Sequence, residues 1–304
     1  LCTTRRVPTD TQGLPTGARR LISLATAVPE RKGARRTGGP PPFLARVGEA
    51  TLGLVREGND ILEFLGEMFL SFGRLFRGKA RFRRSDFLEV VQEVGANAFP
   101  IVTLINFLVG AILAFVGSLQ LQQFGAQIFV ANLVVVAVTR EMASMMTGIV
   151  LSGRSGAAFA ANLGTMTVNE EVDALRTMGF RPMDFLVLPR ILALGLMTPL
   201  LCIYANVMGI LGGMAVGVGM LGLSPLAYLN QSYGAFQLDG FFAGLIKGSV
   251  YGMLVAVAGC LRGLQSGRSA SAVGDAATSA AVTGIVFVIL ADLVITVIYS
   301  AVGF

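Results

Sequence analysis

Residues 140–190 read REMASMMTGIVLSGRSGAAFAANLGTMTVNEEVDALRTMGFRPMDFLVLPR, and this stretch decides the fold. Apolar segments flank it on both sides, yet its centre holds a short polar helix with strong end signals. Thr167 is a favourable N-cap, and Glu170 stands where the carboxylate of a capping box lies. Because Gly179 can end a helix, we expect this one to run from Val168 to Met178. A charged helix between apolar spans cannot lie in hydrocarbon, so we expect it at an aqueous face.

The composition is that of a membrane protein. Hydrophobic residues make up 54% of the chain and charged residues only 14%, whereas soluble domains carry roughly 25% charged residues. The mean hydropathy is +0.70, and several apolar runs approach the length of about 20 residues that crosses a bilayer. The 38 glycines suit closely packed membrane helices.

The positive charge indicates membrane topology rather than nucleic-acid binding. Of the 24 Lys and Arg residues, 16 precede residue 97. We place five spans at about 96–119, 128–151, 185–220, 241–261 and 277–302. The segments before the first, between the second and third, and between the fourth and fifth spans are basic. The positive-inside rule then predicts a cytoplasmic N-terminus, a cytoplasmic polar helix and an external C-terminus.

The residues that are missing exclude several chemistries. The chain has no His, which excludes Ser-His and Cys-His nucleophilic pairs and His-ligated metals. None of the three Lys lies in a P-loop, so any ATP is bound by another subunit. Cys2, Cys202 and Cys260 lack metal-ligand spacing, and we interpret the last two as small buried hydrophobes. We therefore predict no catalytic residue, no metal and no cofactor bound by this chain.

The first part of the chain differs from the rest. Residues 1–42 are basic and rich in Pro and Gly, and we expect a flexible segment; the tail of an upstream domain or an organellar transit peptide are the alternatives. Residues 43–304 form the membrane domain. Within it, residues 43–76 alternate apolar and charged positions at helical spacing. This pattern predicts an amphipathic helix lying on the membrane, with a soluble-domain helix as the alternative.

Ionisable residues inside the spans are candidate functional residues, because each costs at least about 2.5 kcal/mol at the bilayer centre unless paired or hydrated. We expect a polar cavity that receives a lipid headgroup, with Lys247 attracting phosphate and Glu141 tuning it. A structural ion pair or snorkelling of Lys247 is the alternative, and Asp292 is favoured as a structural partner. We assign to the predicted lipid pathway Glu141, Lys247, Arg140, Asn106 and Asp292. A tight turn is expected at Gly153, Arg154 and Gly156, and for Arg140 and Arg154 headgroup anchoring or helix capping remains an alternative.

Four motifs together resemble the MlaE family, the permease subunits of ABC-type lipid transporters that work with MCE-domain proteins. They are Arg140-Glu141, the Gly153–Gly156 segment, the run Glu171–Arg176 and the run Leu186–Arg190. The resemblance extends from about residue 43 to the C-terminus. The sequence departs from the family pattern at residues 271–276, where we expect a loop after the fourth span. Asp275 is an acid that the family pattern does not have there, so the family's residue roles are not carried over to this loop.

The resemblance implies partners as well as a fold. The polar helix resembles a coupling helix that contacts a cytoplasmic ABC ATPase, with a solvated loop helix as the alternative. Its contact residues would be Glu170, Glu171, Asp173 and Arg176, with Leu175 as an apolar anchor. The family further implies a homodimer, an MCE-domain protein on the periplasmic side, membrane lipids and no nucleic acid. The location would be the bacterial inner membrane, with an organellar inner envelope as the less favoured alternative.

We thus expect an all-α polytopic membrane protein: an interfacial helix, five transmembrane helices and a cytoplasmic coupling helix. Its expected function is the permease subunit of an ATP-driven phospholipid transporter with a lipid cavity at the homodimer interface. No covalent chemistry is expected in this chain. A self-sufficient secondary transporter or channel is the main alternative, although the two similar halves typical of such proteins are not visible. An intramembrane enzyme that acts on lipids is a less favoured alternative function.

Overall fold

The computed structural model describes residues 15–17, 20, 43–78 and 83–302. The predicted flexible segment 1–42 lies almost wholly outside these residues, so its character and its boundary at residue 43 stay predictions. The chain divides into two units, Leu1–Gly58 and Asn59–Phe304. The division falls within helix α2 (Phe43–Phe76), so the second half of α2 and all the later helices belong to the second unit.

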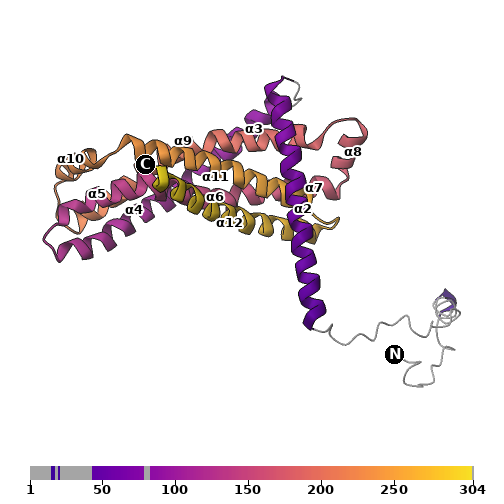
Figure 1. Cartoon of the computed structure of the whole chain (residues 1–304), viewed down its shortest axis with the longest axis horizontal. Coiled ribbons are helices and arrows are strands. Elements are labelled where there is room, and N and C mark those ends of the chain that lie inside the picture. The colour runs from indigo at the N-terminus through magenta and orange to yellow at the C-terminus, as the bar shows by residue number, and fades with distance from the viewer. Residues whose placement is uncertain (1–14, 18–19, 21–42, 79–82, 303–304) are drawn as a thin grey trace, which may run out of the picture. The chain divides into compact units, whose positions relative to one another are not determined.

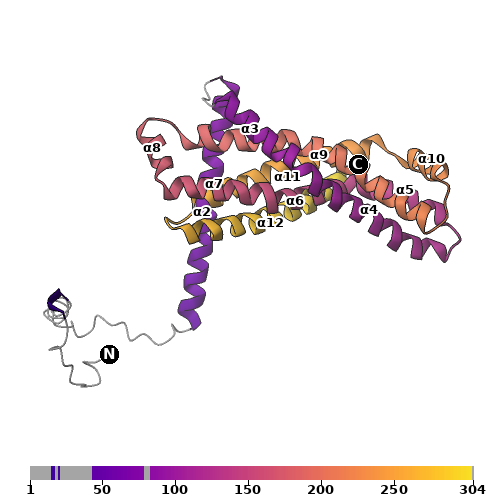
Figure 2. The same cartoon turned by 180° about the vertical axis from the view of Figure 1, so that it is seen from behind.

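The described secondary structure is entirely helical, as Figures 1 and 2 show. After α2 come α3 (Arg84–Val94), α4 (Phe99–Gln122), α5 (Val130–Ala137), α6 (Ala143–Leu151), α7 (Ala157–Val168), α8 (Glu171–Thr177), α9 (Leu188–Gly219), α10 (Pro225–Ala235), α11 (Leu238–Leu264) and α12 (Ala270–Val302). Two short 3-10 turns and three π-helical segments join some of them. In both figures α8 and α10 lie at opposite ends of the bundle.

Five helical runs of the described chain are long and apolar enough to cross a membrane. They cover Ser85–Gln122, Gln127–Val168, Met183–Gly219, Leu238–Leu264 and Ala270–Val302. The predicted all-α class and the five spans are confirmed. The runs are longer than predicted because polar residues at their ends continue the helices. The loop expected at residues 271–276 is therefore wrong, since these residues form the first turns of α12.

Close backbone contacts hold the bundle together around α9 and α11. A side chain at Gly259 of α11 would collide with the backbone of Gly156 in the second span. The same holds at Gly212 of α9, against the backbone of Phe107 in α4. Glycine at these positions lets helices approach closely, as is common in membranes. Cys202 and Cys260 are free and buried in this interior, as predicted, whereas Cys2 lies outside the described residues.

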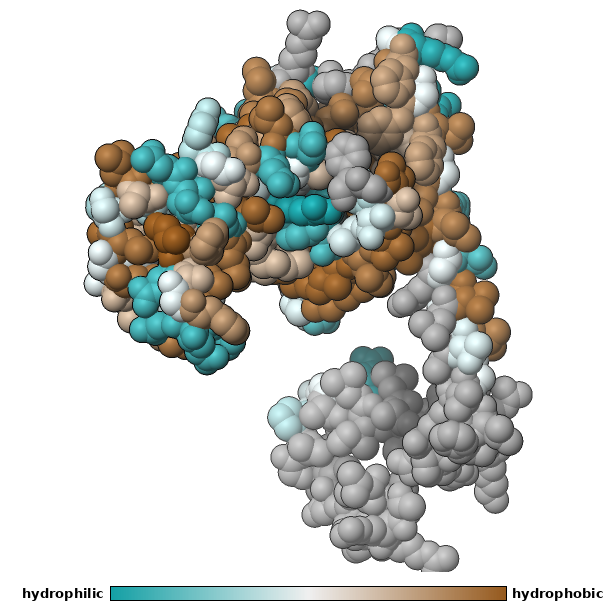
Figure 3. Space-filling view, turned by 60° about the vertical axis from the view of Figure 1, so that its left-hand side comes forward, coloured by the Kyte–Doolittle hydropathy of each residue, from teal (hydrophilic) through white to brown (hydrophobic). Residues whose placement is uncertain are grey.

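The outer helices leave apolar side chains uncovered. In the most apolar 18-residue stretch of each span, 61% of the third span is buried, whereas only 11% of the fifth span, α12, is buried. Figure 3 shows apolar side chains over much of one face of the molecule. An exposed surface of this kind suits contact with lipid or with another membrane helix.

The tight turn predicted at Gly153, Arg154 and Gly156 is wrong. Residues Ser152–Gly156 are a π-helical segment inside one continuous helical run. The hydroxyl of Ser152 donates to the carbonyl of Gly148 at 3.0 Å and is buried. The helix thus satisfies the Ser152 hydroxyl internally, as a bilayer requires, whereas the buried Ser155 hydroxyl has no hydrogen-bond partner among the described residues. A Gly/Ser cluster therefore marked close helix packing and not a loop.

One helix was missed and one is confirmed. The segment between the predicted third and fourth spans, residues 221–240, was expected to be a loop, yet it contains α10, which begins at Pro225. Ser224 followed by Pro225 is a helix-start signal. The predicted helix at residues 43–76 is α2, as expected. In its second half Phe64 is buried while Phe69 is exposed, and Arg74 forms an ion pair with Asp184 at 2.7 Å. Its location on a membrane surface stays a prediction.

Candidate functional site

The helix α8 lies between the second and third spans, but it begins later than predicted. Helix α7 continues to Val168, and the Thr167 hydroxyl donates to the carbonyl of Leu163 at 2.9 Å. Glu170 takes the left-handed conformation, with a φ of 60°, and α8 has no side-chain cap. The predicted capping box is therefore wrong, because Thr167 bonds back into the preceding helix instead of starting a new one.

The predicted end of α8 is confirmed at Gly179. Its φ is 81°, and its N–H donates to the carbonyl of Arg176 at 3.0 Å. The N–H of Phe180 donates to the carbonyl of Leu175 at 2.9 Å. These two bonds form a Schellman motif, which fixes where the helix stops and how the chain enters the third span.

The charged side chains of α8 lie on its exposed side, and one of them contacts the segment that connects α11 to α12. Arg176 contacts Asp173 within α8 at 3.4 Å. Arg268, in the connection between α11 and α12, lies 3.5 Å from Asp173 and 3.8 Å from Glu170. Val172 is buried and Leu175 partly buried against the core of this chain, so both hold α8 in place. Glu171 is exposed and accepts a hydrogen bond from Asn169 at 3.2 Å.

A second cluster lies inside the membrane-spanning bundle, around Lys247 of α11. The Lys247 ammonium donates to Glu141 at 2.5 Å and to Asp292 of α12 at 3.2 Å. It also donates to the Thr296 hydroxyl at 2.7 Å, and the Tyr251 hydroxyl donates to Asp292 at 2.6 Å. Three different spans thus meet at one ammonium group. Snorkelling of Lys247 is wrong, because its side chain is 0% exposed.

The cluster is open on its carboxylate side. The side chains of Glu141 and Asp292 are 25% and 22% exposed, whereas Lys247 is fully enclosed. Two carboxyl groups thus face one ammonium group. Low dielectric strengthens such contacts, yet the burial of the ammonium is favourable only while its partners stay in place. We call Lys247, Glu141, Asp292, Thr296 and Tyr251 the Lys247 cluster.

A π-helical segment, Val138–Met142, presents Glu141 to this cluster. Such segments are rare and often occur at functional sites. A side chain at Gly244 of α11 would collide with the backbone of Thr139, so α11 passes directly against this segment. Arg140 precedes Glu141 in the segment and is half-buried. The sequence motif Arg140-Glu141 therefore marks the place where the second span meets α11.

Other predicted residues lie elsewhere. Asn106 is buried in α4, where its amide donates to the carbonyl of Val102 at 2.9 Å. Among the described residues its side chain has no hydrogen bond to the Lys247 cluster. Arg154 donates to the carbonyl of Glu93 at 3.1 Å and so joins the end of α3 to the second span. This contact matches the helix-capping alternative for Arg154.

Sequence reasoning missed Tyr251, Thr296 and Arg268. Tyr251 and Thr296 each stand one helical turn, four residues, after a charged residue of the same helix, Lys247 and Asp292 respectively. That spacing places them on the same helix face, so a search from each charge would have found them. Arg268 carries no comparable signal. In the described part of the chain no group of three or more His, Cys, Asp or Glu is arranged to hold a metal ion.

Comparisons with known proteins give one consistent result. The profile of the family Permease MlaE matches residues 87–298. A probable ABC transporter permease protein of Rickettsia typhi is 34% identical over 203 residues, 67% of this chain and 78% of that protein. One of Synechocystis sp. is 33% identical over 227 residues, 75% of this chain and 84% of that one. The Arabidopsis thaliana protein TRIGALACTOSYLDIACYLGLYCEROL 1, chloroplastic, is 29% identical over 223 residues, 73% of this chain and 63% of that protein.

Proposed function

The chain belongs to the Permease MlaE family, and from this premise we propose that it is the membrane permease subunit of an ATP-driven lipid transporter. Two copies would form the pathway, with two ABC ATPase subunits at the α8 end and an MCE-domain partner at the α10 end. The chain would lie in a bacterial inner membrane with α8 in the cytoplasm. ATP would be used only by the partner subunits.

One observation carries the proposal, the construction of α8. It is a short charged helix between two apolar spans, anchored by Val172 and Leu175 and ended by a Schellman motif at Gly179. Its exposed side presents Glu171, Asp173 and Arg176. A slack connection would need none of these features. A fixed, charged projection is what a soluble ATPase needs in order to bind a membrane subunit and move it.

The lipid assignment rests on the Lys247 cluster and on the apolar surfaces around it. The partly exposed carboxylates Glu141 and Asp292 give a polar opening within a bundle whose outer helices are apolar. A substrate with a polar headgroup and apolar tails matches both features. The Arabidopsis relative, whose name contains that of a galactolipid, agrees with this substrate class.

The contacts of α8 suggest how motion would reach the cluster. Arg268 contacts Asp173 of α8 and Glu170 directly before α8, and it sits between α11 and α12. These two helices carry Lys247 and Asp292. When the ATPase subunits approach each other, a displacement of α8 would therefore shift α11 and α12 together. Any change in their spacing alters the 3.2 Å contact between Lys247 and Asp292, and with it the opening of the cluster.

The experiment that tests this proposal is co-purification with the ATPase subunit followed by lipid transfer between vesicles. The variant Glu171→Lys with Arg176→Glu reverses charges on α8 and should lose the ATPase subunit and ATP-dependent transfer. The matched control, Glu89→Lys on the exposed side of α3, should keep both. Lipid transfer by the purified chain without any ATPase would refute the proposal and favour a self-sufficient transporter.

A further inference from the structure

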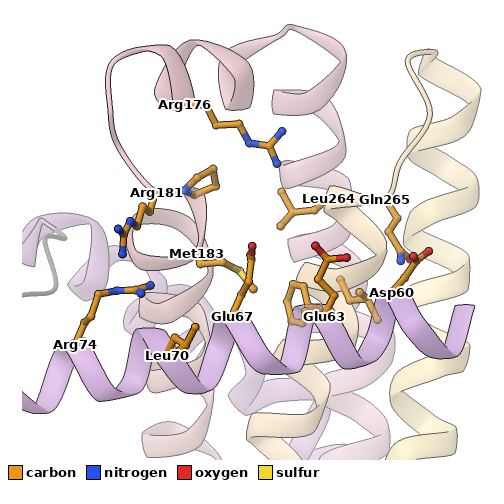
Figure 4. Close-up of a pocket in the computed structure, with 13 residues that line it drawn as sticks. Asp60, Glu63, Glu67, Leu70, Arg74, Arg176, Arg181, Met183, Leu264 and Gln265 are labelled. Carbon is orange, nitrogen blue, oxygen red and sulfur yellow. The ribbon is translucent and has the colours of Figure 1, made fainter. Parts of the chain in front are cut away.

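A charged pocket lies beside α8, about four turns along α11 from Lys247. The second half of α2, the end of α11 and the connection between α8 and α9 line it, and its volume is about 530 Å³. Figure 4 shows its walls. Pockets of this size hold small ligands or headgroups. All its lining residues belong to the unit Asn59–Phe304.

One wall is acidic. Asp60, Glu63 and Glu67 follow one another at helical spacing and share one face of α2, which we call the acidic face. None of the three carboxylates has an ion pair or hydrogen bond to another described residue. Like charges one turn apart destabilise a helix. All three side chains are exposed, so the acidic face can accept hydrogen bonds from a cation that enters the pocket.

The opposite wall is basic. Arg176 extends from α8 towards the acidic face, and Arg181 lies on the connection to α9 (Figure 4). Within the described part of the chain neither guanidinium has an ion pair to the acidic face, and the ion pair of Arg176 is to Asp173 at 3.4 Å. Guanidinium groups match the geometry of phosphate oxygens. The pocket therefore offers a place for a cation and a place for a phosphate side by side.

Apolar residues beside the pocket indicate the depth at which it lies. Phe64, Met183 and Leu264 form part of its lining. On the same stretch of α2, Leu62 and Phe69 are exposed, at 68% and 69%. A helix with a charged face on one side and exposed apolar side chains on another suits the boundary between water and hydrocarbon. Lipid headgroups occupy that boundary.

We propose that this pocket binds the headgroup of a phospholipid that carries a primary ammonium, such as phosphatidylethanolamine. The ammonium would donate to the acidic face of α2, and the phosphate would accept from Arg176 and Arg181. The acyl chains would lie along Leu62 and Phe69. A soluble phosphoethanolamine ester offers the same charges, but the exposed apolar residues favour the lipid. The proposal needs only that the five long helices cross a membrane. Because Arg176 also belongs to the proposed ATPase contact, the phosphate contact is tested at Arg181.

A zero-length crosslink tests the contact directly. The full chain is placed in nanodiscs of phosphatidylcholine with a minor fraction of phosphatidylethanolamine and treated with a water-soluble carbodiimide. This reagent joins a carboxylate to a primary amine as an amide and is itself converted to its urea. Peptide mass spectrometry should find the lipid adduct on Glu63 or Glu67. The exposed control acids Glu49 and Glu89, outside the pocket, should carry about tenfold less adduct, the selectivity expected of a charge-assisted contact.

Variants decide whether the pocket is responsible. Arg181→Gln leaves the acids in place but removes a phosphate contact, so the adduct should fall about tenfold. Glu63→Gln with Glu67→Gln should abolish the preference for phosphatidylethanolamine over phosphatidylcholine in native mass spectrometry. Equal adducts at pocket and control acids, or an unchanged preference in the double variant, would overturn the proposal. Binding of glycerophosphoethanolamine without binding of the lipid would overturn the assignment to a membrane lipid.

Discussion

Replacing Lys247 by Met removes the one ammonium on which three spans converge. The side chain of Lys247 is fully enclosed and donates to Glu141, Asp292 and Thr296. Met fills a similar volume, so the change removes the charge and leaves packing almost intact. Two carboxylates would then face each other without a cation. Removing one partner of a buried ion pair costs about 3–5 kcal/mol, and because both carboxylates reach solvent in part we expect about 3 kcal/mol.

Companion variants separate charge from packing. Glu141→Gln keeps an acceptor for Lys247 and leaves Asp292 as counter-ion, so it should cost about 1 kcal/mol. The triple variant Lys247→Met, Glu141→Gln and Asp292→Asn carries no charge in the cluster, and we expect it to regain most of the stability lost by Lys247→Met, because neutral replacements of buried ion pairs are often tolerated.

The assay is reversible unfolding of the purified chain in detergent micelles, with the free energy of unfolding compared across the variants. A Lys247→Met protein as stable as the parent would refute the reasoning. So would a triple variant less stable than Lys247→Met alone, because the cost would then come from packing rather than from unpaired charge.

Two further predictions concern helix packing and the α8 connection. Gly259→Val places a side chain against the backbone of Gly156, so it should lower the thermal unfolding midpoint sharply or prevent folding. In the control Gly153→Ala the added methyl group meets nothing within 4 Å, so the free energy of unfolding should change by less than about 1 kcal/mol. Thermal unfolding in detergent checks both variants. Arg268→Glu breaks exposed contacts to α8, so it should cost less than about 1 kcal/mol of stability. Under the proposed function it should nevertheless reduce ATP-dependent lipid transfer, and Asp173→Arg in the same chain should restore part of it; an unchanged transfer rate would contradict the proposed route of motion.

The spans and the charged residues inside them could be read from the sequence because both are local signals. A run of apolar residues long enough to cross a bilayer is visible in composition alone. Lys247, Glu141 and Asp292 stand out in such runs because charge there is costly. Their convergence was predicted only as a set of candidate partners, since the chain does not reveal which helices face each other.

Features set by packing were not predictable in the same way. The segment Ser152–Gly156 has the composition of a turn, yet it stays helical because α11 passes against it. Thr167 has the character of a cap, but its hydroxyl finds an acceptor one turn back. Arg268 meets Asp173 across 95 residues of sequence, a contact that depends on how the helices are assembled.

The order in which the cluster's members are synthesised has a consequence for biogenesis. Glu141 emerges from the ribosome first, Lys247 next and Asp292 last, because they belong to the second, fourth and fifth spans. The lysine therefore enters the bilayer when a carboxylate is already there to receive it. The fifth span, which carries Asp292, enters when Lys247 of the fourth span is already in the bilayer. The order of translation therefore provides Lys247 and Asp292 with an oppositely charged partner when each enters the bilayer, whereas Glu141 enters before its partners.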